Sequence, residues 1–346
     1  GWGIDPTRGG YRLLERILAR DPDFFAFVGD RIYADQPIRE LVPLPDGGVW
    51  RNVTTEAVGH VAEALDDFRG RYRYHFLDPL YRRFAGSLAV IHQWDDHEVV
   101  DNWAPGTWIR DERYAVRDVA TLAARARQAW SEHTPHSPVP FDWSRMYRHV
   151  PYGPLLDVFV LDGRSYRSED NANLAAWPRP DAQLYGRPQL AWLKGALARS
   201  RGLWKVILTG QPLGLVIPAW PDVTRFDGMA GATGEVAGRE HEWEDVLRFL
   251  RAKGLTNVVL LSGDVHFASA IHHHPDRAVF REFSPFWEFT AGPMHAGAFG
   301  PAVVDGTFGA EVRFQRGAPE GQSGIGPWSD RQFFGEVEVS GLPRSG

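Results

Sequence analysis

The stretch of sequence that decides the fold reads His92-Gln93-Trp94-Asp95-Asp96-His97-Glu98-Val99-Val100-Asp101-Asn102. It follows a short apolar run, Ser87-Leu88-Ala89-Val90-Ile91, and most of its side chains are carboxylates, amides or imidazoles. An apolar run that leads into a polar cluster is typical of a buried strand that ends in a functional loop. In α/β proteins, ligands bind beyond the carboxyl ends of parallel strands. We therefore expect a metal or ligand site here, with a solvated acidic loop as the alternative.

The composition argues against several classes of protein. The chain has 346 residues, 43% hydrophobic and 24% charged, which is ordinary for a globular protein. A net charge of −6 argues against a nucleic-acid-binding surface, which would need a basic patch. No apolar run approaches the roughly eighteen residues of a membrane span, and the lack of cysteine excludes disulfides and thiolate metal sites.

Buried strands alternate with helices along the chain, which indicates an α/β fold. Apolar runs predict strands at 24–28, 87–91, 204–208 and 257–261, and a hairpin at 147–150 and 155–161. Helical spacing predicts helices over 11–20, 54–73, 78–84, 112–130, 189–197 and 240–253. We expect one domain over 1–346, with irregular insertions at about 36–56 and 213–238 and an irregular C-terminal extension. This extension, and the region just before it, should hold short strand-like pieces at 278–283 and 333–339.

Side chains that can bind a metal ion follow five of these strands: Asp30 and Tyr33; Asp95, Asp96 and His97; Asp162 and Arg164; Gln211; Asp264 and His266. Two adjacent metal ions, about 3.5–4 Å apart, need a carboxylate that bridges them and further donors on each side. Asp30 lies on a Gly-containing turn, a natural place for the bridging ligand. Taken alone, it reads equally well as a turn aspartate that caps its own backbone. The recurrence of such groups at consecutive strand ends favours the metal site.

In combination, four motifs resemble the PhoD-like alkaline phosphatases: Gly29-Asp30-x-x-Tyr33, Trp94-Asp95-Asp96-His97-Glu98, Leu161-Asp162-x-Arg164-x-x-Arg167 and Ser262-Gly263-Asp264-Val265-His266. That family belongs to the calcineurin-like metallophosphoesterases, and its metal site is similar to that of purple acid phosphatases. The resemblance runs from about Tyr11 to the mid-280s and can be extended to Phe308-Gly309. It implies a sandwich of mixed β-sheets flanked by helices.

The resemblance implies metal-binding roles for six residues: Asp30 as the bridge, Tyr33 and His266 on a first, ferric ion, and Asp96, Asp264 and Gln211 on a second ion. Further metal-binding candidates are Asp5, Asp95 and Asn102. His97 would contact the substrate phosphate or protonate the leaving group. Aspartates stand where relatives have Asn and His, which makes the second site richer in oxygen and favours calcium over zinc. The implied cofactors are therefore Fe³⁺ and Ca²⁺, with another divalent ion at the second site left open.

The chain departs from the family at the first strand. PhoD-type members carry a further ligand of the first metal, a Cys, at the end of that strand. This chain has no Cys, and the position falls at or before Gly1. The helix at 11–20 also lacks the strand expected before it in a βαβ unit. We expect the strand and its ligand to lie upstream of Gly1, with Asp5 as the alternative ligand.

Two clusters of basic or imidazole side chains remain. Arg164 and Arg167 could clamp phosphate, because guanidinium groups present a fork of donors, or they could pair with nearby carboxylates. Both interpretations stay open. The run His272-His273-His274 precedes Pro275-Asp276 and is interpreted as a solvated turn.

The expected function is metal-dependent hydrolysis of phosphate esters, monoesters or diesters, by a metal-activated hydroxide at a dinuclear site, with His97 and Arg164 as catalytic residues. Arg164 and Arg167 would also bind the substrate, a small or polymeric phosphate ester. The alternative is a catalytically silent phosphate- or metal-binding protein of the same fold, which the missing first-strand ligand favours. The family resemblance also implies an extracellular or periplasmic location.

Overall fold

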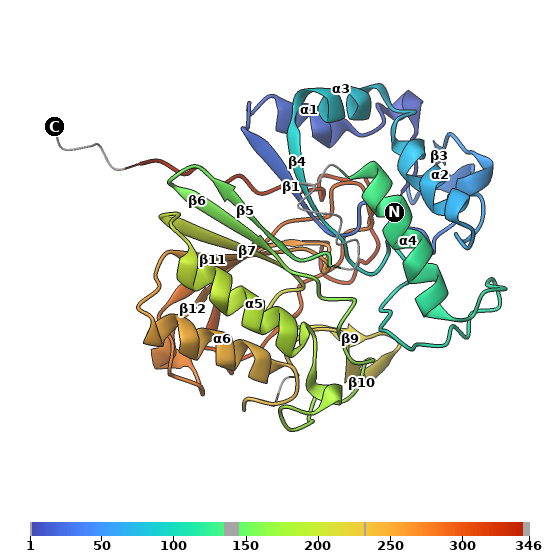
Figure 1. Cartoon of the computed structure of the whole chain (residues 1–346). Helices are drawn as coiled ribbons and strands as arrows, with labels where there is room; N and C mark the ends of the chain where they lie inside the picture. Colours follow the sequence, from blue (N-terminus) through green and yellow to red (C-terminus); the bar gives the residue numbers. More distant parts are fainter. Residues whose placement is uncertain (1, 135–144, 232, 342–346) are drawn as a thin grey trace.

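The computed structural model describes residues 2–134, 145–231 and 233–341, which form four layers (Figure 1). The largest layer is a mixed sheet of seven strands in the order β15-β12-β13-β11-β7-β6-β5. These strands are β5 (Arg148–Tyr152), β6 (Leu156–Val160), β7 (Trp204–Gly210), β11 (Val258–Ser262), β12 (Ala268–His273), β13 (Phe286–Thr290) and β15 (Ala310–Arg316). The inner pairs β6–β7, β7–β11 and β11–β13 are parallel, and the outer pairs are antiparallel.

A second, smaller sheet packs on the large one. It pairs β1 (Phe24–Val28) with β4 (Ala89–Gln93) in parallel, so that Val28 lies opposite Gln93. One face of this small sheet, including Phe24 and Ile91, packs against the inner face of the large sheet. The other face packs against α1 (Arg12–Leu18) and α3 (Pro79–Ser87) through Phe25 and Phe27. The apolar run of β1 therefore packs on both faces, although its five residues are only partly buried rather than fully buried as the sequence predicts.

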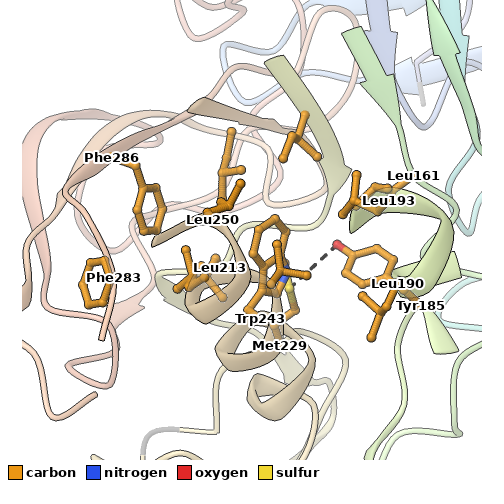
Figure 2. Close-up of a cluster of buried hydrophobic side chains, with 14 of the residues drawn as sticks. Leu161, Tyr185, Leu190, Leu193, Leu213, Met229, Trp243, Leu250, Phe283 and Phe286 are labelled. Atoms are coloured by element: carbon orange, nitrogen blue, oxygen red, sulfur yellow. Dashed lines mark hydrogen bonds between the residues drawn. The ribbon is translucent and has the colours of Figure 1, made fainter. Parts of the chain in front are cut away.

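The outer face of the large sheet is covered by α5 (Gly186–Arg199) and α6 (Glu240–Ala252), which lie side by side in Figure 1. Their core includes Trp243 and Leu250 from α6 and Leu193 from α5 (Figure 2). The Tyr185 hydroxyl lies 3.8 Å from Met229 Sδ within this core. The fold is thus the expected α/β sandwich flanked by helices, with a large sheet that is mixed and a small sheet that is parallel.

Several elements differ from the predicted bounds because a side chain sets where each begins. The helix predicted over 54–73 is α2 (Leu65–His75), and Asp67 accepts hydrogen bonds from the backbone of Glu63 and Ala64 just before it. The helix predicted over 112–130 is α4 (Val119–His133), because Asp118 caps the backbone of Ala120 and Thr121. Single 3₁₀ turns are η1 (Pro6–Arg8), η2 (Glu56–Val58), η3 (Pro180–Ala182) and η4 (Pro275–Arg277).

The two segments expected to be irregular contain short strands. Segment 36–56 holds the hairpin β2 (Leu41–Pro43) and β3 (Val49–Arg51). Segment 213–238 holds β8 (Leu215–Val216), β9 (Pro218–Ala219) and β10 (Asp222–Phe226), and β8 pairs with β14 (Val303–Val304). Asp305, directly after β14, donates its backbone N–H to Gly214 and lies beside the carboxyl of Glu240, and both carboxyls are buried. The segment is therefore held against the C-terminal part of the chain.

The C-terminal third differs most from its prediction. The pieces at 278–283 and 333–339 are not strands, whereas β12, β13 and β15 are. The reading of 272–274 as a solvated turn was wrong. His273 lies fully buried in β12, where its Nε2 is 3.1 Å from the Glu288 carboxylate of β13. β13 alternates buried and exposed residues with Glu288 inside and Trp287 outside, an inverted pattern that hydrophobic periodicity misses.

No helix in the described ranges is long and apolar enough to cross a membrane.

Candidate metal centre

Three loops converge at the carboxyl ends of β1, β4 and β11. Gly29 follows β1 with φ of +89°, and a Cβ there would lie 2.5 Å from Asp95 Cβ in the loop after β4. Gly263 follows β11, and its added Cβ would lie 2.5 Å from the Val28 carbonyl of β1. Glycine is thus required where the loops touch. Gln93 ties the sheets together by donating to the carbonyls of Leu161 and Leu208, at 2.8 and 3.0 Å.

The convergence brings acidic and imidazole groups together in two overlapping sets: Asp30, Asp96 and His97, and Asp95, Asp96 and Asp264. Within each set the potential ligand atoms all lie within 4.8 Å of one another, and Asp96 belongs to both. Asp30 and Asp264 adopt left-handed backbone conformations, with φ of +52° and +64°. Such strained non-glycine residues cluster at functional sites, which agrees with their place at the strand ends.

The groups expected to hold the first metal ion lie together. The Tyr33 hydroxyl is 2.9 Å from His266 Nε2 and 3.5 Å from Asp30 Oδ2. His266 Nδ1 lies 2.7 Å from the Gly297 carbonyl, which fixes the proton on Nδ1 and leaves Nε2 as the ring nitrogen with a lone pair. Burial lowers the pKa of His266 to about 4, so the ring is neutral at neutral pH. With Asp264, these groups line a cavity of about 1330 Å³.

His97 is held by a residue that the sequence reasoning missed. Its Nδ1 lies 2.9 Å from both carboxylate oxygens of Asp35, which is almost fully buried. Burial alone would lower the pKa of His97, but the charges of Asp35, Asp96 and Asp30 outweigh it and raise this pKa well above the ordinary value. Asp35 belongs to the same strand-end loop as Asp30, and its place in that loop is the signal that could have identified it.

Both arginines pair with carboxylates. Arg164 is fully buried and forms ion pairs with Asp95, with Asp227 at 2.8 Å and with Asp264 at 3.1 Å. Arg167 pairs with Asp227 at 2.6 Å and with Asp170 at 2.6 Å. Asp227, in segment 213–238, was not identified from the sequence, because nothing in its local pattern marks it. Of the two interpretations left open, carboxylate pairing is the one seen in this structure.

The remaining candidates lie in different surroundings. Gln211 donates its side-chain amide to Asp227, and its Oε1 is buried without a hydrogen-bond donor. The Asn102 backbone donates to Asp96 Oδ2 at 2.8 Å. Asp5 caps η1 and accepts from the Thr7 backbone, the Thr7 hydroxyl and the Arg51 backbone. Neither set of ligand atoms found in the described residues includes Asp5.

The donor set fits metal ions. Asp30 Oδ1, Asp95 Oδ2 and Gln211 Oε1 are buried oxygens that have no hydrogen-bond donor. Burial and the neighbouring carboxylates raise the pKa values of Asp30 and Asp264 well above the ordinary range. Unpaired buried oxygens are costly unless a cation or donor satisfies them, and carboxylate and amide oxygens are ligands for hard cations. Cations bound at the two sets of ligand atoms would reduce this cost for Asp30 and Asp95.

Comparison with known proteins gives consistent matches. The family model of PhoD-like phosphatases matches residues 1–345. Alkaline phosphatase D of Bacillus subtilis (strain 168) is 29% identical over 318 residues, which cover 88% of this chain and 50% of that protein. The solved structure of PhoD superimposes with a TM-score of 0.63 at 25% identity, covering 86% of this chain and 57% of its own. Purple acid phosphatase PPD1 from yellow lupin (Lupinus luteus) seeds gives a TM-score of 0.44 at 11% identity, and the match covers 92% of this chain and 42% of that one. The chain spans about half the length of the curated relative it matches.

Proposed function

The chain belongs to the PhoD-like phosphatase family, and on this basis we propose that it hydrolyses phosphate esters with the help of bound metal ions. The observation that carries the proposal is the pair of ligand sets that share Asp96, at the meeting point of three strand-end loops. Its substrates would be monoesters, diesters or both, as small molecules or polymers. Asp227 reaches the centre from segment 213–238, which supports a role for that segment in the choice of substrate.

We assign the metal ligands as follows: Asp30 to both ions, Tyr33 and His266 to Fe³⁺, and Asp96, Asp264 and Gln211 to Ca²⁺ or another divalent ion. Asp95 and Asn102 lie close enough to support this second set. When bound, two such ions would activate a water molecule and stabilise the charge that develops on the phosphoryl oxygens. The unpartnered oxygens of Asp30, Asp95 and Gln211 are the support for this assignment.

His97 and Arg164 carry out different parts of the proposed reaction. Asp35 orients the His97 ring and keeps it protonated, so that Nε2 can donate a proton to the leaving alkoxide. Arg164 is enclosed by carboxylates and holds Asp95 and Asp264 in place, which supports a positioning role rather than a phosphate clamp. Arg167 supports the same network through Asp227.

The test is hydrolysis of 4-nitrophenyl phosphate and bis(4-nitrophenyl) phosphate by protein purified with Fe³⁺ and Ca²⁺. We expect turnover that EDTA abolishes and that Asp30→Asn and Asp96→Asn each reduce by at least about a thousandfold, since an unassembled centre loses the large electrostatic contribution to catalysis. Asp276→Asn, at the exposed turn η4, is the matched control and should keep wild-type activity. The faster of the two substrates would identify the ester class.

The iron assignment has its own readout. Ferric iron bound by a phenolate absorbs visible light, so the loaded protein should be coloured and Tyr33→Phe should remove the colour. A colourless, metal-loaded wild type would overturn Fe³⁺ at this position. Metal binding without hydrolysis of either ester would support the catalytically silent alternative. The family implies that the protein acts outside the cytoplasm. Cell fractionation, with activity assayed in each fraction, tests this expectation.

A further inference from the structure

Glu98 is fully buried beside the metal centre, yet it belongs to neither set of ligand atoms. Its Oε1 accepts the backbone N–H of Arg31 at 2.7 Å and that of Ile32 at 3.4 Å. Its Oε2 accepts the N–H of Asp30 at 3.2 Å and that of Asp95 at 2.7 Å. One carboxylate therefore ties together the backbones of the loops that follow β1 and β4.

These contacts fall where the two loops must be held at a fixed distance. Asp30 and Asp95 carry carboxylates that repel each other, and Asp30 adopts a left-handed conformation that is costly for a residue with a side chain. Gly29 already touches Asp95, so the loops cannot approach further. The four N–H groups on Glu98 oppose their separation, because moving the loops apart would break hydrogen bonds to one of them.

We propose that Glu98 is a positioning residue that sets the spacing between Asp30 and Asp96 and thereby the affinity of the centre for metal ions. The inference rests on the metal centre of the proposed function, but not on the reaction that the centre catalyses. Glu98 touches neither substrate nor metal in this assignment, because its oxygens are taken up by backbone donors.

A second buried glutamate supplies the matched control. Glu242 is also fully buried, and it accepts the backbone N–H groups of Leu184, Tyr185 and Gly186 at 3.1, 2.8 and 2.8 Å. The groups that donate to it lie at the start of α5, on the outer face of the large sheet. Glu242→Gln should therefore cost a comparable amount of stability without moving the metal loops.

The experiment compares wild type, Glu98→Gln, Glu98→Asp and Glu242→Gln. Metal affinity is measured with Mn²⁺ as the probe, by the loss of the free-ion electron paramagnetic resonance signal. Backbone protection is measured in the same metal-free proteins by amide hydrogen exchange. Glu98→Asp keeps the charge but shortens the side chain by one C–C bond, about 1.5 Å, so that it cannot reach both loops. Glu98→Asp therefore distinguishes the loss of loop positioning from the loss of a negative charge near the metal ions.

We expect both Glu98 variants to bind Mn²⁺ at least tenfold more weakly than wild type, since partners that orient metal ligands contribute 10–100-fold in affinity. The amides of Asp30, Arg31 and Asp95 should exchange at least tenfold faster in both. Glu242→Gln should leave both quantities unchanged and expose the amides of 184–186 instead.

Wild-type affinity or wild-type exchange in Glu98→Asp would overturn the proposal. If wild type binds no Mn²⁺, the exchange measurement still decides whether Glu98 joins the loops, and the failure then belongs to the metal assignment. If wild type binds Mn²⁺ but hydrolyses neither ester, the proposed reaction fails and the role of Glu98 stands.

Discussion

Arg239 holds segment 213–238 in place, and replacing it should lower the free energy of unfolding more than a substitution at an exposed position does. The side chain is fully buried at the start of α6. Its Nη1 donates to the carbonyls of Phe226, Asp227 and Gly228 at 2.8, 2.9 and 3.1 Å. Its Nη2 donates to the carbonyls of Ser168 and Glu169, each at 3.0 Å. One guanidinium group thus joins the segment that carries Asp227 to the loop after β6.

The structure sets the size of the effect. Arg239→Met removes the donor from the carbonyls of Phe226 and Gly228, at about 1–3 kcal/mol each, whereas the Asp227 carbonyl keeps Arg167 Nη2 as a donor at 2.8 Å. Burial, together with repulsion from Arg167, lowers the pKa of Arg239 to about 9, so the wild-type protein carries a desolvation cost that the methionine removes. Allowing for this offset, we expect a loss of about 3–4 kcal/mol in the free energy of unfolding. Arg239→Lys should lose about 2 kcal/mol, because an ammonium group cannot reach both sides of the fork.

The assay is equilibrium unfolding in urea at neutral pH with EDTA, followed by tryptophan fluorescence and fitted with a common slope. Arg179→Met is the control, because Arg179 is mostly exposed and pairs with the neighbouring Asp181 at the surface. It should change stability by less than about 0.5 kcal/mol. The reasoning is refuted if Arg239→Met stays within about 1 kcal/mol of wild type.

Three further predictions follow from contacts that a single substitution alters. Gly29→Ala should lower the free energy of unfolding by at least about 2 kcal/mol more than Gly47→Ala does. Both glycines have positive φ, but only Gly29 lies against the loop after β4, and equal losses in urea unfolding would contradict that close approach. His273→Ala should destabilise by about 2–4 kcal/mol and His274→Ala by less than about 1, because only the first is buried against a carboxylate; a reversed order would contradict the placement of β12. Burial and a neighbouring carboxylate raise the pKa of Glu240 from its ordinary 4.5 to about 8. Between pH 4.5 and 8 the folded state therefore binds more protons than the unfolded state, so the free energy of unfolding falls as the pH rises through this range. Glu240→Gln should lack this slope and gain stability relative to wild type as the pH rises from 5 to 9, measured by thermal unfolding; parallel pH curves would count against it.

The core strands and the convergence of the polar motifs could be predicted from the chain. Continuous apolar runs such as Phe24–Val28 need cover on both faces, so they identify central strands without reference to anything distant. The carboxyl ends of parallel strands meet at one edge of a sheet, so the polar motifs after them were expected to converge. Asp30, Asp96 and Asp264 do converge in the structure.

The edge strands could not be predicted in this way. β12 and β13 bury His273 and Glu288 and expose Trp287, because the two buried polar groups satisfy each other across the strand pair. Local periodicity cannot register such a pairing, since each residue by itself looks misplaced. The helix starts at Leu65 and Val119 were likewise set by single aspartates rather than by the apolar spacing.

Local sequence thus specified which segments are strands and which residue types stand at their ends, because burial and backbone preference act over a few neighbouring residues. Tertiary structure alone decided how those residues are used. It placed Asp35 on His97, enclosed Arg164 among carboxylates, and set Glu98 between two loops. These outcomes depend on which charges and donors meet across the fold, and that electrostatic pairing is a property of distances in space rather than of spacing along the chain.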